Sequence, residues 1–312
     1  MIAKLTNITK TYKSGVKALN NLSYEVRPGE IYGLLGPNGS GKTTSINVLL
    51  SVLNHDKGEV EIFGEKMTPN RYDLKAQIGV VPQNIAVFNE LTVYENIDYF
   101  CGLYIKDKNK RKKLVEEAIE FVSLHEFRNF LPKKLSGGLL RRLNIACGIA
   151  HKPKLIILDE PTVAVDPQSR NKILENIVEL KENGATIIYT SHYMEEVEQI
   201  CDYIVIMDKG EVIASGTKEK LKASIDLGEM IEVEILELEN RKILNDIKEI
   251  NNVYDVIYEN TKLIIKSGKG KTNIPEVLQI LSRNDITYDS ILSTQPTLND
   301  VFLEITGKQL RD

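Results

Sequence analysis

The stretch Gly36-Pro37-Asn38-Gly39-Ser40-Gly41-Lys42-Thr43 decides how the surrounding chain folds. It matches the pattern G-x-x-x-x-G-K-[ST], in which backbone N–H groups at a helix start surround phosphate oxygens and the lysine neutralises their charge. Residues 31–35 before it form a short apolar strand pattern, and apolar residues from Ile46 to Leu53 recur at the spacing of one helical face. Strand, loop and helix in this order predict a phosphate-binding loop rather than a tight turn that binds no ligand. Thr43 would then be a ligand of Mg²⁺.

A second glycine-containing turn, Leu135-Ser136-Gly137-Gly138, precedes another helical pattern. Ser136 is a favoured N-cap residue, and the glycines allow backbone amides to approach an anion closely. Taken alone, this turn is explained equally well as a simple helix cap.

An unbroken apolar run at Leu155–Leu158 is followed directly by Asp159 and Glu160. Such a run is typical of a strand buried on both faces of a parallel sheet. Since ligands bind at the carboxyl ends of parallel strands, both carboxylates are expected beside the phosphate loop. Asp159 would order Mg²⁺ and its water shell, and Glu160 would be the general base for an attacking water. The alternative is that the two acids cap a surface helix, but that interpretation does not explain why a buried strand ends in two charged residues.

Together these motifs resemble the ATP-binding cassette (ABC) ATPase family over about residues 1–220. The resemblance implies an α/β fold of the P-loop NTPase type, with a mixed sheet core and a helical subdomain at about residues 84–150. It also implies that the chain binds ATP and Mg²⁺ and hydrolyses ATP.

The motif residues of the family carry over position by position. Residues 36–44 match the Walker A loop, Gln83 the Q-loop, residues 135–138 the signature, Asp159 and Glu160 the Walker B motif, Asp166 the D-loop, His192 the switch histidine, and Tyr12 the aromatic that stacks on adenine. The resemblance implies catalytic roles for Glu160, His192 and Gln83, and Mg²⁺ contacts for Thr43, Gln83 and Asp159. The implied nucleotide contacts are Tyr12, Gly36, Asn38, Gly39, Ser40, Gly41, Lys42, Thr43, Thr44, Ser136, Gly137 and Gly138.

Plainer explanations exist for some of these residues. Tyr12 is also consistent with a half-buried aromatic at a strand end, Gln83 with a surface loop residue, and His192 with a structural histidine. Gln83 and His192 each follow a predicted strand, at residues 78–81 and 186–189, which favours positions near the γ-phosphate.

Two positions depart from the family pattern. The family signature usually continues with glutamine, where this chain has Leu139, and the D-loop reads Val163-Ala164-Val165-Asp166. Neither departure alters the phosphate-facing glycines or serine. What they put in doubt is the strength of contacts across a dimer, and so the turnover rate.

Beyond Lys222 the sequence lacks glycine-rich loops and shows a new alternation of patterns. The predicted order is strand (230–236), helix (241–250), strand (253–258), strand (262–266), helix (274–283) and strand (286–292), with a last helix at 298–305. This βαββαβ order is typical of the ferredoxin-like, split-βαβ arrangement. A small α+β accessory domain is therefore predicted over residues 221–312.

The composition is that of a globular protein. Of the 312 residues, 42% are hydrophobic and 27% charged, and the formal net charge is -4. A nucleic-acid partner is not expected, because polyphosphate binding normally requires a basic face. No apolar run reaches the roughly 18 residues of a membrane span, and residues 1–6 lack the apolar core of a secretion signal, so a cytoplasmic chain is expected. Cys101, Cys147 and Cys201 lie in apolar segments and are expected to be buried, reduced thiols.

The resemblance also implies partners. In the family, two cassettes pack head to tail, so that nucleotide on Lys42 of one subunit meets Ser136 and Gly138 of the other. We therefore expect a second ATP-binding subunit, identical or a close paralogue, and a separate transmembrane permease. The chain would reach the cytoplasmic face of the membrane only through that permease, which is expected to contact the stretch between Gln83 and Leu135.

Residues 162–170 and 297–303 resemble the exporter ATPases of the antibiotic-resistance type, which carry a small C-terminal domain, so export is the expected direction. The alternatives are import with a separate binding protein, a soluble ABC protein acting on ribosomes or DNA, and an ATP-dependent regulatory module that does not hydrolyse nucleotide. The single, uninterrupted cassette argues against the second alternative, and Glu160 and His192 argue against the third.

Overall fold

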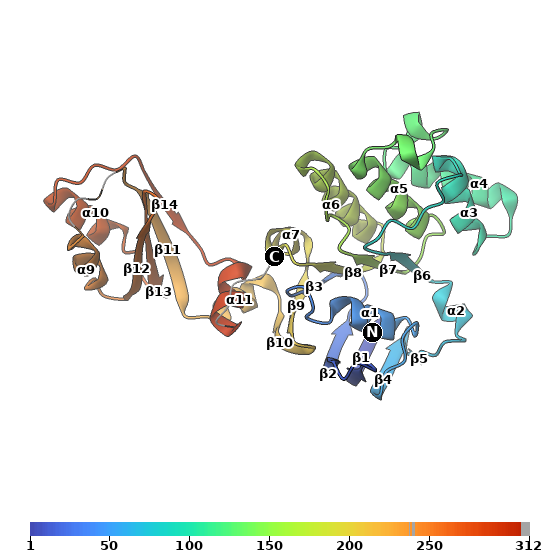
Figure 1. Cartoon of the computed structure of the whole chain (residues 1–312), viewed down its shortest axis with the longest axis horizontal. Helices are drawn as coiled ribbons and strands as arrows, with labels where there is room; N and C mark the ends of the chain where they lie inside the picture. Colours follow the sequence, from blue (N-terminus) through green and yellow to red (C-terminus); the bar gives the residue numbers. More distant parts are fainter. Residues whose placement is uncertain (237, 239–240, 307–312) are drawn as a thin grey trace. The chain divides into compact units, whose positions relative to one another are not determined.

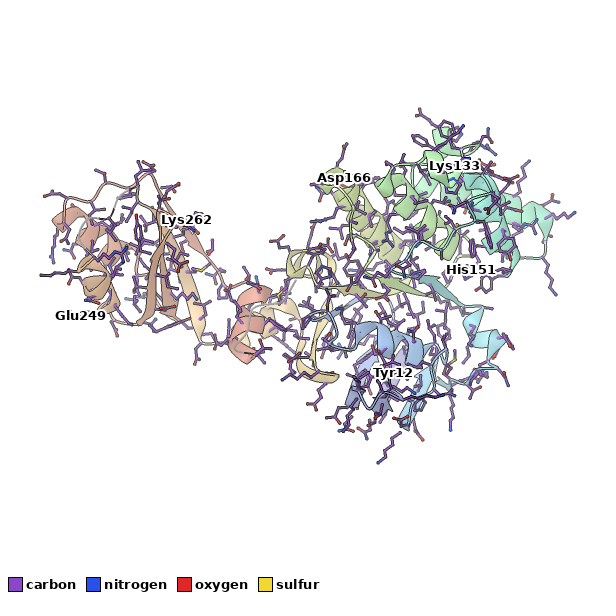
Figure 2. All side chains as sticks on the ribbon, viewed as in Figure 1. Tyr12, Lys133, His151, Asp166, Glu249 and Lys262 are labelled. Carbon is purple, nitrogen blue, oxygen red and sulfur yellow. The ribbon has the colours of Figure 1, made fainter. Side chains whose placement is uncertain are left out.

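The computed structural model describes residues 1–236, 238 and 241–306, and the chain divides into two compact units, one over Met1–Lys218 and a second that begins at Glu219 (Figure 1). Figure 2 shows the side chains of both on the same ribbon.

The larger sheet of the first unit has the strand order β10-β9-β3-β8-β7-β6. Its strands are β3 (Ile31–Leu35), β6 (Ile78–Val81), β7 (Leu155–Asp159), β8 (Thr186–Ser191), β9 (Tyr203–Asp208) and β10 (Glu211–Gly216). All pairs are parallel except the β9–β10 hairpin, so the mixed sheet core is confirmed. Every residue of β3, β7 and β8 is buried, as expected for strands covered on both faces. The loops after β3, β6, β7 and β8 therefore leave the same edge of the sheet.

A second, antiparallel sheet has the order β2-β1-β4-β5. Its strands are β1 (Ala3–Thr11), β2 (Lys17–Val26), β4 (Lys57–Ile62) and β5 (Glu65–Lys66). Helix α1 (Lys42–Leu49) lies between the two sheets (Figure 1), and its buried Ile46 and Leu49 share one core with Leu5 of β1 and Leu34 of β3. The phosphate-loop helix is thus held from both sides.

Helix α1 is shorter than its apolar pattern predicts. The periodicity runs to Leu53, but the helix ends at Leu49, and Ser51 adopts a left-handed backbone with φ 49°. The N–H groups of Val52 and Leu53 then both donate to the carbonyl of Asn47. Leu53 still packs against the core from outside the helix. An apolar residue at this position therefore does not show whether the helix continues to it or has already ended.

The helical region contains α3 (Val93–Gly102), α4 (Lys108–Phe121), two single-turn 3-10 segments (His125–Phe127 and Pro132–Lys134) and α5 (Gly137–Ile149), with the short α2 (Tyr72–Lys75) before it. Thr92 and Glu95 form a capping box at the start of α3, since each side chain bonds the backbone of the other. Helix α4 buries Val115, Ala118 and Ile119 at the spacing of one helical face. The remaining helices of this unit are α6 (Pro167–Glu182) and α7 (Met194–Ile200).

The second unit carries a sheet of order β12-β13-β11-β14, antiparallel throughout. Its elements run β11 (Leu227–Glu234), α9 (Ile243–Lys248), β12 (Val253–Glu259), β13 (Lys262–Gly268), α10 (Ile274–Arg283), β14 (Ser290–Thr294) and α11 (Leu298–Thr306), and α8 (Lys218–Ser224) leads into them. Helices α9 and α10 bury Ile243, Ile247, Val277 and Leu281 against the sheet. The strand predicted at 286–292 was wrong in its start, because Ile286 donates to Leu281 to close the end of α10 and β14 begins only at Ser290.

Cys101, Cys147 and Cys201 are buried and unpaired with one another, which confirms the expected thiols. Burial raises the pKa of Cys101 to about 11. Over residues 1–236, 238 and 241–306, no helix combines the length and the apolar character that crossing a membrane requires.

The strand that leads to Gln83 depends on a close backbone approach between β6 and α5. A Cβ atom on Gly79 would lie 2.6 Å from Cγ of Pro153 and would also meet the carbonyl of Gly148. We predict that Gly79→Ala destabilises the protein by about 1–3 kcal/mol, because the backbone must separate to admit the methyl group. Urea unfolding of both variants measures this. The control is Gly102→Ala at the end of α3, where the three atoms nearest to an added Cβ belong to the flexible Arg111 side chain, so stability should be kept or slightly raised. Equal unfolding midpoints for the two variants would contradict the prediction.

Candidate functional site

The phosphate loop is fitted closely to the backbone around it. Gly41 has φ 105°, and a Cβ atom there would lie 2.7 Å from the carbonyl oxygen of Ala18, so a side chain is excluded. The N–H of Gly210, in the β9–β10 turn, donates to the carbonyl of Ser40. The Oγ atom of Ser40 is buried and has no hydrogen-bond partner within the described part of the chain. A buried hydroxyl without a partner inside a loop of backbone amides is consistent with an anion such as phosphate.

Lys42 extends its ammonium group across this loop. It is 4% exposed, and Nζ donates to the carbonyl oxygens of Gly36 at 2.7 Å and Pro37 at 3.2 Å. Nζ also lies 3.4 Å from Oε1 of Glu160. Burial lowers the pKa of Lys42, and the nearby carboxylate of Glu160 opposes that shift by favouring the charged form.

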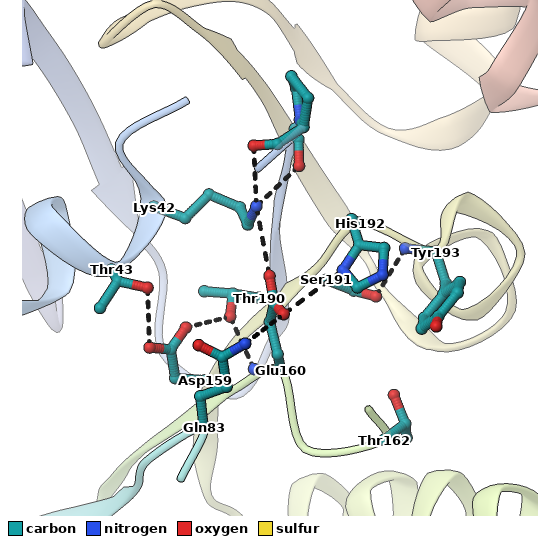
Figure 3. Close-up of polar contacts among 12 residues, drawn as sticks. Lys42, Thr43, Gln83, Asp159, Glu160, Thr162, Thr190, Ser191, His192 and Tyr193 are labelled. Carbon is teal, nitrogen blue, oxygen red and sulfur yellow. Dashed lines mark hydrogen bonds and ion pairs between the residues drawn. The ribbon is translucent and has the colours of Figure 1, made fainter. Parts of the chain in front are cut away.

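Thr43 and Asp159 meet at the carboxyl edge of the sheet (Figure 3). The hydroxyl of Thr43 donates to Oδ2 of Asp159 at 3.0 Å. The other carboxylate oxygen, Oδ1, accepts from the hydroxyl of Thr190 at 2.6 Å. The Thr190 oxygen in turn accepts from the N–H of Glu160 at 2.9 Å. Thr190 therefore ties the two neighbouring acids to strand β8.

Glu160 is the centre of the polar cluster in Figure 3. Its backbone is in the left-handed region, with φ 47°, an uncommon and costly conformation for a residue with a side chain. Oε2 accepts from Nε2 of Gln83 at 3.0 Å and lies 3.4 Å from Nδ1 of His192, while Oε1 faces Lys42. The side chain is buried. The structure thus brings together the residues that the sequence pattern placed after β6, β7 and β8.

The donor atoms of Thr43 and Asp159 suit a hard divalent cation. Across the described ranges 1–236, 238 and 241–306, no group of several His, Cys, Asp or Glu side chains could hold a metal by itself. Mg²⁺ is usually bound by one or two carboxylates together with substrate phosphates, so a carboxylate and a hydroxyl beside a phosphate loop fit that ion. The amide nitrogen of Gln83 is directed to Glu160 instead.

Tyr12 lies just after β1, and 40% of its surface is exposed (Figure 2). Its hydroxyl is 3.2 Å from Oγ1 of Thr44, the residue that follows the loop motif. This position is open to a planar ligand beside the phosphate loop, and it also agrees with a strand-end aromatic.

Ser136, Gly137 and Gly138 occupy a different place from this cluster. Ser136 caps α5 by accepting from the N–H of Leu139 at 3.3 Å, and both Ser136 and Gly137 are exposed. Gly138 is buried, and a Cβ atom on it would lie 2.6 Å from Cβ of Ser169 at the start of α6. The helix cap and the anion-binding turn, which the sequence left open, are therefore compatible. The nearest Cβ contacts of Gly137 and Gly138 lie in the segment 164–169, not around Lys42.

Asp166 begins α6 as its N-cap and accepts from the N–H of Ser169 at 2.9 Å (Figure 2). Hydrogen bonds from the backbone N–H and the side chain of Ser169 lower the pKa of the Asp166 carboxyl. The two helix starts at Ser136 and Asp166 are adjacent because Gly138 packs directly against Ser169.

Thr190 was missed by the sequence analysis, which ended β8 at Tyr189. In the parallel register, Thr190 pairs with Asp159. A polar residue at the carboxyl end of a buried strand, beside a strand that ends in two acids, was the available signal.

The ABC transporter family profile matches residues 19–163. The chain is similar to the linearmycin resistance ATP-binding protein LnrL of Bacillus subtilis, at 39% identity over 98% of each chain. It is similar to the Nod factor export ATP-binding protein I of Sinorhizobium fredii, at 30% identity over 99% of this chain and 87% of the relative. Among solved structures, the dimeric post-hydrolysis state of the ATP-binding cassette MJ0796 bound to ADP and Pi is similar with TM-score 0.64 and 30% identity, covering 69% of this chain and 98% of that one.

We predict that Thr190→Val, which keeps the side-chain shape, lowers the ATPase turnover number about tenfold or more, because Asp159 and Glu160 both lose the hydroxyl that orients them. The matched control is Thr186→Val on the same strand, where the hydroxyl accepts from the N–H of Gly29 at 2.9 Å. Each change should cost about 1 kcal/mol of stability for a lost hydrogen bond. Steady-state phosphate release and thermal unfolding of both variants check this. Equal turnover in the two variants would show that Thr190 has only a structural role.

Proposed function

This chain belongs to the ABC transporter family, as an ATP-binding and ATP-hydrolysing subunit that powers a transporter, and we propose that it hydrolyses ATP at the cluster around Lys42 and Glu160 to drive export. The observation that carries this proposal is the convergence of Gln83 and His192 on the carboxylate of Glu160. These groups come from three different strand ends and meet beside the phosphate loop.

In the proposed mechanism, Glu160 accepts a proton from the attacking water, and Gln83 and His192 orient that water and the base. Lys42 neutralises charge on the β- and γ-phosphates, and amides of the loop from Gly36 to Thr43 surround them. Thr43 and Asp159 would hold Mg²⁺, which supplies further neutralisation of the phosphate charge. The rotation of Lys42 from Glu160 to the phosphates would free the carboxylate for its role as a base.

ABC ATP-binding subunits dimerise and work with separate transmembrane permeases. We propose that the cassette of this chain, over about residues 1–220, forms a head-to-tail dimer in which Ser136, Gly137 and Gly138 complete the nucleotide site of the other subunit. Ser136 and Gly137 are exposed at the N-terminus of α5, where backbone amides attract anions. A homodimer is the simplest form, and a close paralogue would supply the same groups.

Export is proposed because the relatives that match nearly the whole chain are named as resistance and export proteins. The C-terminal unit is included in these matches, so it is proposed as part of the same exporter architecture, with the ferredoxin-like βαββαβ order. The chain would then act at the cytoplasmic face of the membrane, through the permease alone.

The proposed permease contact is an apolar surface of the helical region. A cavity of about 200 Å³ is lined by Val80, Pro82, Ala86, Phe100, Leu103, Tyr104, Asn144, Cys147, Gly148 and His151. Leu103, which directly follows α3, is 60% exposed, and Tyr99, on α3, is 47% exposed. Exposed apolar groups in such a cluster are typical of protein interaction sites. The Pro82 carbonyl accepts hydrogen bonds from Arg141 and Asn144, so this surface is directly connected to Gln83.

We predict that Leu103→Glu abolishes co-purification of the chain with membrane proteins solubilised from its own cells, because a charge on the apolar surface would be desolvated on docking. The control is Val52→Glu, at an aliphatic residue that is 74% exposed outside this surface. Both variants should keep wild-type unfolding temperatures and basal ATP hydrolysis. Loss of membrane recovery by both variants, or by neither, contradicts this docking surface.

We predict that Glu160→Gln traps an ATP-bound dimer, since the amide keeps the shape of the site but cannot accept the proton of water. Size-exclusion chromatography should show a dimer with ATP and monomer with ADP, and phosphate release should fall at least about 100-fold. Lys42→Ala is the complementary variant, in which nucleotide affinity itself should fall, because the loop loses its only lysine ammonium. Turnover at the wild-type rate by Glu160→Gln would falsify the assignment of the base.

A further inference from the structure

A buried carboxylate lies behind the cluster of Glu160 and His192. Glu196, on α7, is 3% exposed and faces hydroxyl groups rather than solvent. It accepts hydrogen bonds from Tyr189 at 2.7 Å, from Thr162 at 2.8 Å and from Ser191 at 3.1 Å. Removing a carboxylate from water is costly unless charged and polar partners replace the solvent, and at Oε2 of Glu196 three hydroxyl groups do so.

Arg170 supplies the opposite charge. Its Nε atom lies 3.3 Å from Oε1 of Glu196, and its guanidinium stands 5.0 Å from the ring centre of Tyr193. The Tyr193 ring is in turn 4.1 Å from the ring of His192. The cation thus connects α6, which follows the segment 162–166, to the residues that flank His192.

The hydrogen-bond partners of Glu196 come from two segments of the site, the loop after Glu160 and the strand before His192. Thr162 follows Glu160 by two residues and belongs to the loop that leads to Asp166. Tyr189 and Ser191 belong to β8, which ends at Ser191 directly before His192, and Figure 3 shows Ser191 and His192 together. The Ser191 oxygen also accepts from the N–H of Tyr193 at 2.9 Å, so it holds the backbone on both sides of His192.

We infer that Glu196 is a positioning residue for ATP hydrolysis, which holds the loop after Glu160 and the segment around His192 at the separation where Nδ1 of His192 and Oε2 of Glu160 are 3.4 Å apart. The inference rests on the proposed roles of Glu160 and His192. We assign Glu196 no role in binding nucleotide. Its described hydrogen bonds and ion pairs go to residues outside the phosphate loop, namely Thr162, Tyr189, Ser191 and Arg170.

The first test compares Glu196→Gln, Glu196→Ala and wild type as full chains. Glutamine keeps the shape and one acceptor oxygen but cannot pair with Arg170, and alanine removes every interaction. The ATPase turnover number should fall about 10- to 100-fold for alanine and less for glutamine, since small misplacements of catalytic groups have effects of this size. The KM for ATP and the Kd for a nucleotide analogue should stay within about threefold of wild type, because binding and positioning are separate here.

Two further variants separate positioning from folding. Thr162→Val removes one hydroxyl with little change of shape, and remains informative if Glu196→Ala does not fold. The matched control is Glu229→Gln in the C-terminal unit, where a carboxylate likewise accepts from Thr272 at 2.7 Å, Ser293 at 2.6 Å and the N–H of Asn273 at 3.1 Å. Glu229→Gln should lower stability without lowering turnover.

A double-mutant cycle with His192→Ala gives the deciding result. If Glu196 acts through His192, adding Glu196→Gln to His192→Ala should lower turnover far less than it does in wild type. An equal fold-loss in both backgrounds overturns the inference in favour of a general structural effect. Wild-type turnover in Glu196→Gln, with His192→Ala impaired, overturns the inference alone. Wild-type turnover in His192→Ala overturns the proposed role of His192 and this inference together.

Discussion

The buried contact between Lys42 and Glu160 is the constraint on which the rest of the site depends. Two opposite charges, 4% and 5% exposed, lie 3.4 Å apart at the carboxyl edge of a parallel sheet. Their desolvation is offset only when each has further polar partners, which explains the carbonyls that accept from Lys42 and the amide of Gln83 that donates to Glu160. This arrangement suits a polyphosphate ligand, because phosphate oxygens can replace the carboxylate of Glu160 as the partner of the Lys42 ammonium.

The geometry of that contact is maintained by elements distant in sequence. The loop that carries Lys42 is supported by α1, which is packed between two sheets, and by the β9–β10 turn, where Gly210 donates to Ser40. The left-handed backbone of Glu160 is held by Thr190, whose carbonyl and hydroxyl both accept from the Glu160 N–H. A costly conformation at the candidate base is therefore maintained by the neighbouring strand. This arrangement is typical of functional sites, where surrounding structure stabilises local strain.

The structure shows where the two departures from the family pattern, at Leu139 and in residues 163–165, lie. Leu139 contributes its backbone N–H to the Ser136 cap, so the substitution leaves that hydrogen bond intact. Residues 163–165 lead into the Asp166 cap, and Gly138 packs on Ser169 behind it. The signature and the D-loop thus form one surface at adjacent helix starts. Both departures lie next to this surface, which is where the proposed dimer would close, and outside the contacts of Lys42.

The sequence by itself determined the phosphate loop, the acids at the end of β7, the glutamine and histidine after β6 and β8, and the order of elements in the second unit, because each depends on local spacing and periodicity. It did not reveal that α1 stops at Leu49, that β14 begins at Ser290, or that β1 and β2 form a separate sheet with β4. These features depend on packing partners far away in the chain. Only the tertiary structure decided which residues support the site, since Thr190 and Glu196 acquire their partners through strand register and burial. A threonine or glutamate has no distinctive pattern in sequence, and its role is set by the atoms that surround it.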